Sequence, residues 1–225
     1  MKKIRTILSS IRYVFKSSRP ALNDLDRKLE KYLNYDNGFF IEAGANDGYS
    51  QSNTYFLEKR RKWSGILVEG IPELFERARK QRPNSVVYNC ALVSSDFPDS
   101  TVTMHYANLM SVVEGSLKTD EAQDRHIRDG LDVQHLDRSY SVTVPARTLE
   151  SILDEHPNLP NIDFFSLDVE GYELNVLKGM NLARYKPKYI LVEARFFEEV
   201  SSFLQSYSYE MIEELSFHDY LYRSI

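Results

Sequence analysis

Four short apolar runs in this chain each end at an acidic residue, and helix-forming segments separate them. The runs are residues 39–42, 65–69, 162–167 and 189–193, and their acids are Glu42, Glu69, Asp168 and Glu193. Short runs that are apolar at consecutive positions are typical of strands buried on both faces of a sheet. Strands that alternate with helices predict a mostly parallel sheet covered on both faces, which is the α/β class.

The rest of the chain extends this pattern. We expect helices over residues 22–33, 52–61, 73–81, 149–155, 173–178 and 196–206. Further strands are expected over residues 85–92, 101–106 and 141–144, with two last strands, 210–214 and 218–222, forming an antiparallel hairpin. A length of 225 residues suits one such domain, which we place at residues 21–225.

Residues 107–140 interrupt the alternation. They are polar, rich in Asp, Arg and His, and show little strand period. We interpret them as an insertion in the domain, with a helix around residues 119–128.

The first 20 residues form a separate basic arm. They contain six Lys or Arg and no acid, and apolar residues recur among them at helical spacing. Two interpretations stay open, a terminal helix packed on the domain and a surface helix that contacts an anionic membrane through residues 1–19.

Composition narrows the partners and the compartment. The net charge is −5, which disfavours a nucleic-acid partner because phosphate binding relies on clustered Lys and Arg. Cys90 is the single cysteine, so an intrachain disulfide is excluded. No apolar run has the length of a membrane span. We therefore expect a cytoplasmic protein, with peripheral contact at the inner face of a membrane as the alternative that the arm leaves open.

The loop after the first run carries the clearest chemical signal. In open parallel sheets, ligands bind at the carboxyl ends of the strands. Gly44 and Gly48 flank Asn46 and Asp47 here, but the first glycine of a dinucleotide fingerprint is replaced by Glu42. An acidic loop is a poor cradle for pyrophosphate and suits the cationic sulfonium and ammonium groups of S-adenosylmethionine.

The second run supports a nucleoside site. Glu69 lies 21 residues after Gly48, ends its strand and is followed by Gly70. A carboxylate in that position can accept hydrogen bonds from both ribose hydroxyls.

The run that ends at Asp168 provides a second carboxylate, Glu170, two residues later. Two close carboxylates raise the pKa of one of them, so that one can deprotonate a substrate hydroxyl. A divalent metal held by the pair is a less favoured alternative, and the metal ligands stay unassigned. His105, on a strand-like segment just before the insertion, is a further candidate for the base.

These motifs resemble the FkbM-type methyltransferases. The resemblance covers about residues 38–195 and rests on residues 40–48, 67–69, 89–92 and, above all, 166–179. It implies the class I Rossmann-like fold with a seven-stranded sheet, and O-methylation that uses S-adenosylmethionine. Carried over to this chain, it implies that Glu42, Gly44 and Gly48 line the cofactor, Glu69 holds the ribose, Cys90 and Ala91 border the adenine, and Asp168 and Glu170 face the methyl-transfer site.

The prediction is thus an S-adenosylmethionine-dependent O-methyltransferase that acts on a hydroxyl of a sugar, glycan or secondary metabolite. A non-catalytic binding or scaffold protein with this fold, and a nicotinamide-dependent oxidoreductase, are the alternatives. The predicted catalytic residues are Asp168, Glu170 and His105. The predicted cofactor-binding residues are Glu42, Gly44, Asn46, Asp47, Gly48, Glu69, Gly70, Cys90, Ala91 and Asp168. The sequence does not decide the oligomeric state.

Overall fold

The structure is a computed structural model that describes residues 17–225. The basic arm predicted over residues 1–20, with its membrane contact through residues 1–19, therefore falls almost entirely outside the described residues. Of the arm's cations the structure places Arg19, which forms an ion pair with Glu30 at 2.6 Å. Among the helices of residues 17–225, none is long and apolar enough to cross a membrane.

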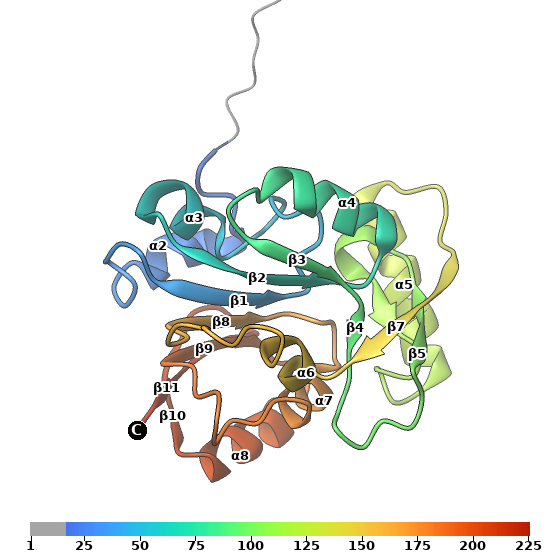
Figure 1. Cartoon of the computed structure of the whole chain (residues 1–225). Coiled ribbons are helices and arrows are strands. Elements are labelled where there is room, and N and C mark those ends of the chain that lie inside the picture. Colours follow the sequence, from blue (N-terminus) through green and yellow to red (C-terminus); the bar gives the residue numbers. More distant parts are fainter. Residues whose placement is uncertain (1–16) are drawn as a thin grey trace, which may run out of the picture.

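A seven-stranded sheet runs through the centre of the molecule (Figure 1). Its strands, in spatial order, are β10 (Tyr209–Glu214), β11 (Asp219–Ser224), β9 (Tyr189–Glu193), β8 (Phe164–Leu167), β1 (Phe39–Ala43), β2 (Ser64–Glu69) and β3 (Val86–Asn89). The pairs from β9 to β3 are parallel. β11 lies antiparallel to both β9 and β10. The predicted α/β class, the mostly parallel seven-stranded sheet and the C-terminal antiparallel hairpin are confirmed.

Helices cover both faces of this sheet. On one side lie α2 (Leu25–Leu29), α3 (Tyr55–Arg61) and α4 (Pro72–Gln81), and on the other lie α6 (Leu149–Leu153), α7 (Glu173–Lys178) and α8 (Phe197–Ser206) (Figure 1). Successive strand residues point to opposite faces, so Phe40 packs in the core with α2 and α3 while Ile41 packs in the core with α6, α7 and α8. This two-sided burial explains why the central strands β1, β2, β8 and β9 are mostly apolar at consecutive positions.

The first helix is shorter than residues 22–33, the range that the sequence predicts. A 3₁₀ turn (Leu22–Asp24) precedes α2, and Asn23 and Asp24 have positive φ values of 52° and 55°. Left-handed residues cannot continue a right-handed helix, so the chain bends before α2 begins.

A second, four-stranded sheet extends the fold beyond β3. Its order is β4 (Ala91–Leu92), β7 (Ser141–Arg147), β5 (Thr101–His105) and β6 (Val112–Val113). The sequence predicts one strand over residues 85–92, but the chain leaves the main sheet at Cys90. The cause is local, because the Asn89 side chain donates hydrogen bonds to the carbonyls of Glu69 and Gly70 and ends the pairing with β2.

The predicted insertion at residues 107–140 contains a 3₁₀ turn η2 (Asn108–Met110), strand β6 and helix α5 (Asp120–Gln134). This helix runs past the expected end at residue 128. Gly130 lies inside the helix and does not end it. A Cβ at this position would lie 2.9 Å from the Cβ of Met110, so the glycine allows η2 to pack close to the helix. The helix ends at His135, whose φ of 53° is left-handed.

Candidate active site

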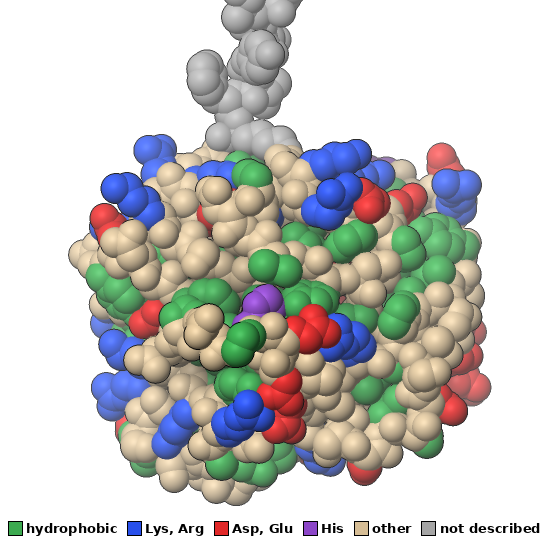
Figure 2. Space-filling view, in the orientation of Figure 1, with side chains coloured by type: hydrophobic (Ala, Val, Ile, Leu, Met, Phe, Trp, Pro, Cys, Tyr) green, Lys and Arg blue, Asp and Glu red, His purple; other side chains and the backbone are tan. Residues whose placement is uncertain are grey.

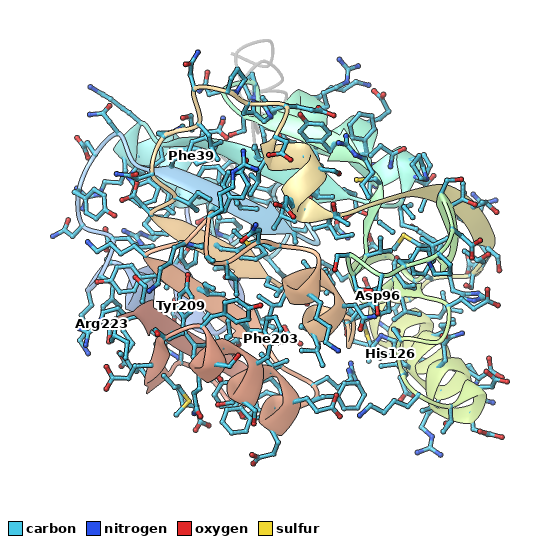
Figure 3. The ribbon with its side chains drawn as sticks, turned by 60° about the horizontal axis from the view of Figure 1, so that its bottom comes forward. Phe39, Asp96, His126, Phe203, Tyr209 and Arg223 are labelled. Carbon is cyan, nitrogen blue, oxygen red and sulfur yellow. The ribbon has the colours of Figure 1, made fainter. Side chains whose placement is uncertain are left out.

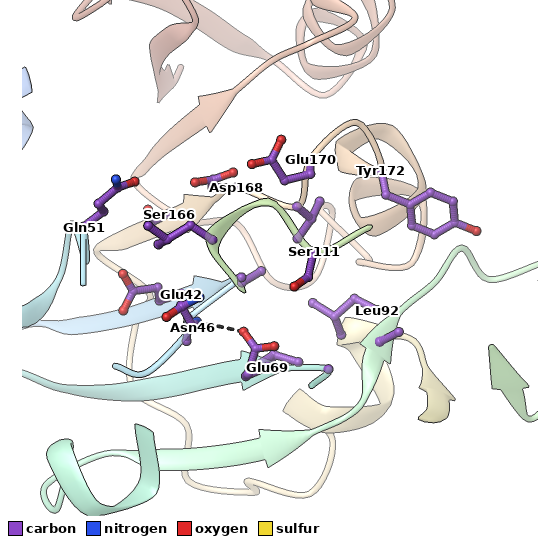
Figure 4. Close-up of a pocket in the computed structure, with 18 of the residues that line it drawn as sticks. Glu42, Asn46, Gln51, Glu69, Leu92, Ser111, Ser166, Asp168, Glu170 and Tyr172 are labelled. Carbon is purple, nitrogen blue, oxygen red and sulfur yellow. Dashed lines mark hydrogen bonds between the residues drawn. The ribbon is translucent and has the colours of Figure 1, made fainter. Parts of the chain in front are cut away.

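A cleft opens where β1, β2 and β8 end, and the second sheet and the insertion close its other side (Figure 4). The cleft and its open mouth together hold about 910 Å³ of space, open solvent included. Of the residues that the sequence predicts for cofactor or catalysis, those that line it are Glu42, Gly44, Asn46, Glu69, Gly70, Cys90, Ala91, Asp168 and Glu170.

Glu69, at the end of β2, joins the glycine loop to the next helix. Its carboxylate accepts hydrogen bonds from the backbone N–H of Asn46 at 2.7 Å and of Ile71 at 2.8 Å. Each carboxylate oxygen has a second lone pair, so both can still receive a ligand hydroxyl. Burial raises the pKa of Glu69 to about 7. A hydroxyl-bearing ligand such as ribose would favour its ionised form.

Gly44 lines the cleft, and packing also requires a glycine there. Its φ is +82°, and a Cβ there would lie 1.7 Å from the carbonyl oxygen of Asp168. Any side chain would therefore push the glycine loop away from the end of β8. Gly44 keeps the ends of β1 and β8 close together at the edge of the cleft.

Glu42 is the first acid of the loop, but its charge is already paired. It accepts hydrogen bonds from the side chains of Ser52, Thr54 and Arg82, the last at 3.1 Å. The Arg82 side chain is fully buried and also pairs with Glu58 at 2.7 Å. Sequence reasoning missed Arg82, since nothing in the helix pattern around it shows that it turns inward. Glu42 thus anchors residues 52–54, which explains why α3 begins at Tyr55 instead of residue 52.

Three predicted site residues lie away from the cleft lining. Asp47 accepts hydrogen bonds from the N–H groups of Tyr49 and Ser50, so its carboxylate shapes a turn. Gly48 packs on α4, where a Cβ would lie 2.9 Å from the Cα of Ala78. His105 lies on β5 next to Met104, and because side chains alternate along a strand, Met104 faces the cleft while His105 does not.

A cluster of carboxylates borders the cleft beyond β8 and β9. Asp168, Glu170 and Glu193 each place an oxygen within 4.8 Å of the others. Burial and the neighbouring charges of Glu193 and Glu170 raise the pKa of Asp168 well above its usual range. Burial and the neighbouring charges of Glu170 and Asp219 raise the pKa of Glu193 to about 7. At neutral pH this cluster can therefore accept a proton.

The insertion contributes to this cluster through His126 of α5. Arg195 donates to Glu170 at 2.8 Å and to Nδ1 of His126 at 3.2 Å. An arginine cannot accept, so the proton of the neutral imidazole is on Nε2, which lies 3.4 Å from the Glu170 carboxylate. Burial lowers the pKa of His126 and keeps it neutral. His126 is buried on the side of α5 that faces the rest of the molecule (Figure 3).

The other end of the cleft is mostly apolar. Cys90, Ala91 and Leu92 line it from β4 and the residue before it, and Leu109 lines it from the insertion. Burial raises the pKa of the Cys90 thiol to about 12, so Cys90 is a small apolar wall residue here. A flat aromatic base fits between such walls.

Sequence reasoning also assigned no role to several polar residues of the cleft. They are Ser50, Gln51, Ser52, Asn53 and Ser166 on one side and Asn108 and Ser111 of the insertion on the other. Asn108 accepts a hydrogen bond from the side chain of Asn46, which ties the insertion to the glycine loop. Only the three-dimensional fold brings these segments together.

Charges of both signs are interspersed on the face of the molecule drawn in Figure 2. On that face Lys and Arg stand beside Asp and Glu, which differs from the clustered basic surface typical of phosphate binding.

Comparison with known proteins supports a single family. The model of the Methyltransferase FkbM domain matches residues 42–223. Methyltransferase 1 of Beauveria bassiana (strain ARSEF 2860) is 24% identical over 160 residues, which are 65% of this chain and 59% of that protein. The chain thus spans less than two thirds of the length of this curated relative.

Solved structures resemble the chain more loosely. A TehB-like SAM-dependent methyltransferase from Corynebacterium glutamicum aligns with 100% of this chain and 95% of its own, at a TM-score of 0.45 and 8% identity. A SAM-dependent methyltransferase from Aquifex aeolicus aligns over 96% of both chains, at a TM-score of 0.47 and 13% identity. At these scores the strand order of the chain itself, rather than the likeness, defines the fold.

Proposed function

The chain belongs to the FkbM methyltransferase family, and from that premise we propose that it transfers the methyl group of S-adenosylmethionine to a hydroxyl of a sugar, glycan or other hydroxylated metabolite. One observation supports the proposal above all: a single cleft holds two carboxylates at the ends of two strands. Glu69 can accept hydrogen bonds from a ribose, and Asp168 can accept a proton. Membership of a methyltransferase family disfavours the two alternatives, a nicotinamide-dependent oxidoreductase and a non-catalytic binding or scaffold protein.

The cleft residues fit the parts of this cofactor in the order of the strands. Cys90 and Ala91 follow β3 and offer apolar walls to the adenine. Glu69 ends β2 and offers two oxygens to the ribose. Asp168 follows β8, where the cationic end of the ligand would lie beside carboxylates. Three neighbouring strand spacings span roughly 14 Å, enough for an extended nucleoside with an amino-acid chain.

When bound, S-adenosylmethionine supplies a methyl group already activated by a positively charged sulfur. The chain's own residues then have two tasks, to position the acceptor and to remove its proton. A sugar hydroxyl is not acidic, so a base is needed. Asp168 is the candidate, because its raised pKa makes it a stronger base than an exposed aspartate.

Glu170 and the insertion would position the acceptor. Glu170 lines the cleft, and its carboxylate is held by Arg195 and faces His126 of α5. Leu117 of the insertion packs against Gly171 in the same turn, where a Cβ would lie 2.7 Å from the Leu117 side chain. A different insertion would therefore change the turn that carries Glu170, which supports a role of the insertion in the choice of acceptor.

A screen of hydroxylated acceptors, read out by release of S-adenosylhomocysteine, tests the proposal. Sugars, glycosides and hydroxylated metabolites should include at least one substrate whose turnover falls about 100-fold or more in Asp168→Asn. If the chain binds the cofactor and methylates amines or thiols but no hydroxyl, the result would contradict O-methylation.

A further inference from the structure

The two layers of helices that cover the central sheet carry opposite charge. On one side, α2, α3 and α4 contain eight Lys or Arg and four Asp or Glu, and two of those acids, Asp26 and Glu58, are buried. On the other side, α6, α7 and α8 contain one Lys and four Glu. The positive charge of these six helices is thus gathered on one side of a chain whose net charge is −5.

The densest group of cations is at the end of α3, where residues 59–62 are Lys-Arg-Arg-Lys. Lys59 donates a hydrogen bond to the carbonyl oxygen of Gln81 at 3.3 Å, so the end of α3 lies against the end of α4. Lys80 precedes Gln81 and therefore belongs to the same group. We call residues 59–62 and Lys80 the basic patch.

Most of the basic patch carries charge that no acid neutralises. The side chains of Arg60, Lys62 and Lys80 are exposed, and none of the three forms an ion pair in the part of the chain that the structure describes. Arg61 differs, because it pairs with Glu30 at 3.4 Å. Neighbouring like charges repel one another, and an anionic partner would relieve that repulsion. The patch is separate from the cleft, which none of its residues lines.

The chain enters the domain beside the basic patch. Ser18 Oγ accepts a hydrogen bond from Arg60 at 2.9 Å, and the Arg19 guanidinium lies 5.0 Å from the centre of the Phe56 ring of α3. These contacts fix the entry point at the edge of the molecule where α3 and α4 lie, which is the upper edge in Figure 1. Lys and Arg side chains stand along the same edge in Figure 2.

The segment that precedes this entry point is itself basic. Residues 1–16 contain five Lys or Arg and no acid, and apolar residues recur among them at helical spacing. A cationic segment is repelled by a cationic patch, whereas one anionic surface attracts both. Apolar residues between the cations allow such a segment to enter the headgroup boundary of a membrane, which a nucleic acid does not offer.

We propose that the basic patch and residues 1–16 together dock the protein on an anionic lipid bilayer. The apolar residues of the segment enter the headgroup boundary, and the patch lies on the negatively charged headgroups. Each Lys or Arg near such a surface strengthens binding by about fivefold. The inference does not depend on the identity of the methyl acceptor, and it leaves the cleft free because the patch lies outside it.

Flotation with lipid vesicles tests this docking surface. The full chain, a Lys62→Gln and Lys80→Gln double variant, and a Lys178→Gln and Lys186→Gln control are mixed with phosphatidylcholine vesicles that contain either no anionic lipid or about 30% phosphatidylserine. All four lysines are exposed, and both double variants lose the same charge. The control lysines lie outside the patch, on α7 and in the loop before β9. Thermal unfolding checks that each variant is folded.

The unmutated chain and the control should float with phosphatidylserine vesicles, with affinities within about twofold of each other, and should not float with phosphatidylcholine alone. The patch variant should bind roughly tenfold more weakly, and this difference should shrink as salt is raised. Equal binding of the two double variants would show that residues 1–16 act without the patch, and would overturn the inference. So would flotation that needs no anionic lipid, no flotation of the unmutated chain, or binding of the patch to a DNA duplex in place of vesicles.

Discussion

The guanidinium of Arg82 lies 3.1 Å from the carboxylate of Glu42, and both side chains are buried beneath the glycine loop. An acid at the start of a cofactor loop suggests a direct ligand contact, but here the acid is part of an internal network. Arg82 also donates to the carbonyl of Gly48 at 3.3 Å, so one buried cation holds both ends of the loop. The loop's shape therefore depends on a residue some 40 positions away in the sequence.

We expect Arg82→Met to lower the free energy of unfolding by about 3–5 kcal/mol, because Glu42 would stay buried without a cation and Glu58 would keep only its ion pair with Lys59. Arg79→Met, in the last turn of α4 and three residues before Arg82, removes an exposed ion pair with Glu76 and should cost about 0–1 kcal/mol. Denaturant unfolding of the two variants measures the difference. Equal losses would show that the buried network contributes no more than a surface pair.

Gly44→Ala should destabilise the chain by about 2–4 kcal/mol, since it combines a left-handed backbone with a clash against Asp168. Gly115→Ala is the matched control, because Gly115 has a similar φ of +78° but nothing within 4 Å of an added Cβ. The control should cost about 1 kcal/mol from backbone strain alone. Thermal unfolding compares them, and similar losses in both would refute the close approach of β1 and β8.

Glu69→Gln should weaken binding of 5′-deoxy-5′-methylthioadenosine, a nucleoside without the amino-acid chain, by roughly tenfold. In the unmutated chain, affinity for this ligand should rise from pH 6 to pH 8. The pKa of Glu69 is raised to about 7, so the carboxylate ionises over that interval and becomes a stronger acceptor for ribose hydroxyls. Calorimetry at three pH values checks this. A pH dependence that persists in Glu69→Gln would assign it to another group.

His126→Leu should reduce turnover of the acceptor by about tenfold while cofactor affinity stays within about twofold, because His126 contacts Glu170 and Arg195 and does not line the cleft. His105→Leu changes the histidine that the sequence suggested as a base, and it should leave both quantities unchanged. Steady-state kinetics of the two variants decides between them. The reverse result would restore His105 as a catalytic residue and remove the role of α5.

The strands and their acidic ends could be predicted from the sequence because burial on both faces leaves a local, continuous apolar signal. Glu69 and Asp168 follow directly from that signal, as each ends such a run. Gly44 was also identified, as a residue that lines the cofactor, and the structure adds its close approach to Asp168. The sequence pattern indicates that another group approaches the backbone closely at Gly44, without indicating which group that is.

Other parts of the site depend on contacts between distant segments. Arg82 lies at a helix end of ordinary composition. Its side chain turns inward because it pairs with Glu42, which is 40 residues away in the sequence. Asn53 lies in residues 52–61, which the sequence predicts as helix, whereas α3 begins only at Tyr55. His126 belongs to a polar insertion whose buried side is defined by Arg195 and Glu170. The local spacing of apolar residues in the sequence does not indicate such contacts between distant segments.

Calorimetric titration of the full chain with S-adenosylmethionine tests the central claim most directly, that the cleft between Glu69 and Asp168 is a site for this cofactor. The account predicts saturable binding of one cofactor per chain, weakened roughly tenfold by Glu69→Gln. Absence of detectable binding at millimolar cofactor, with the chain folded, would contradict it.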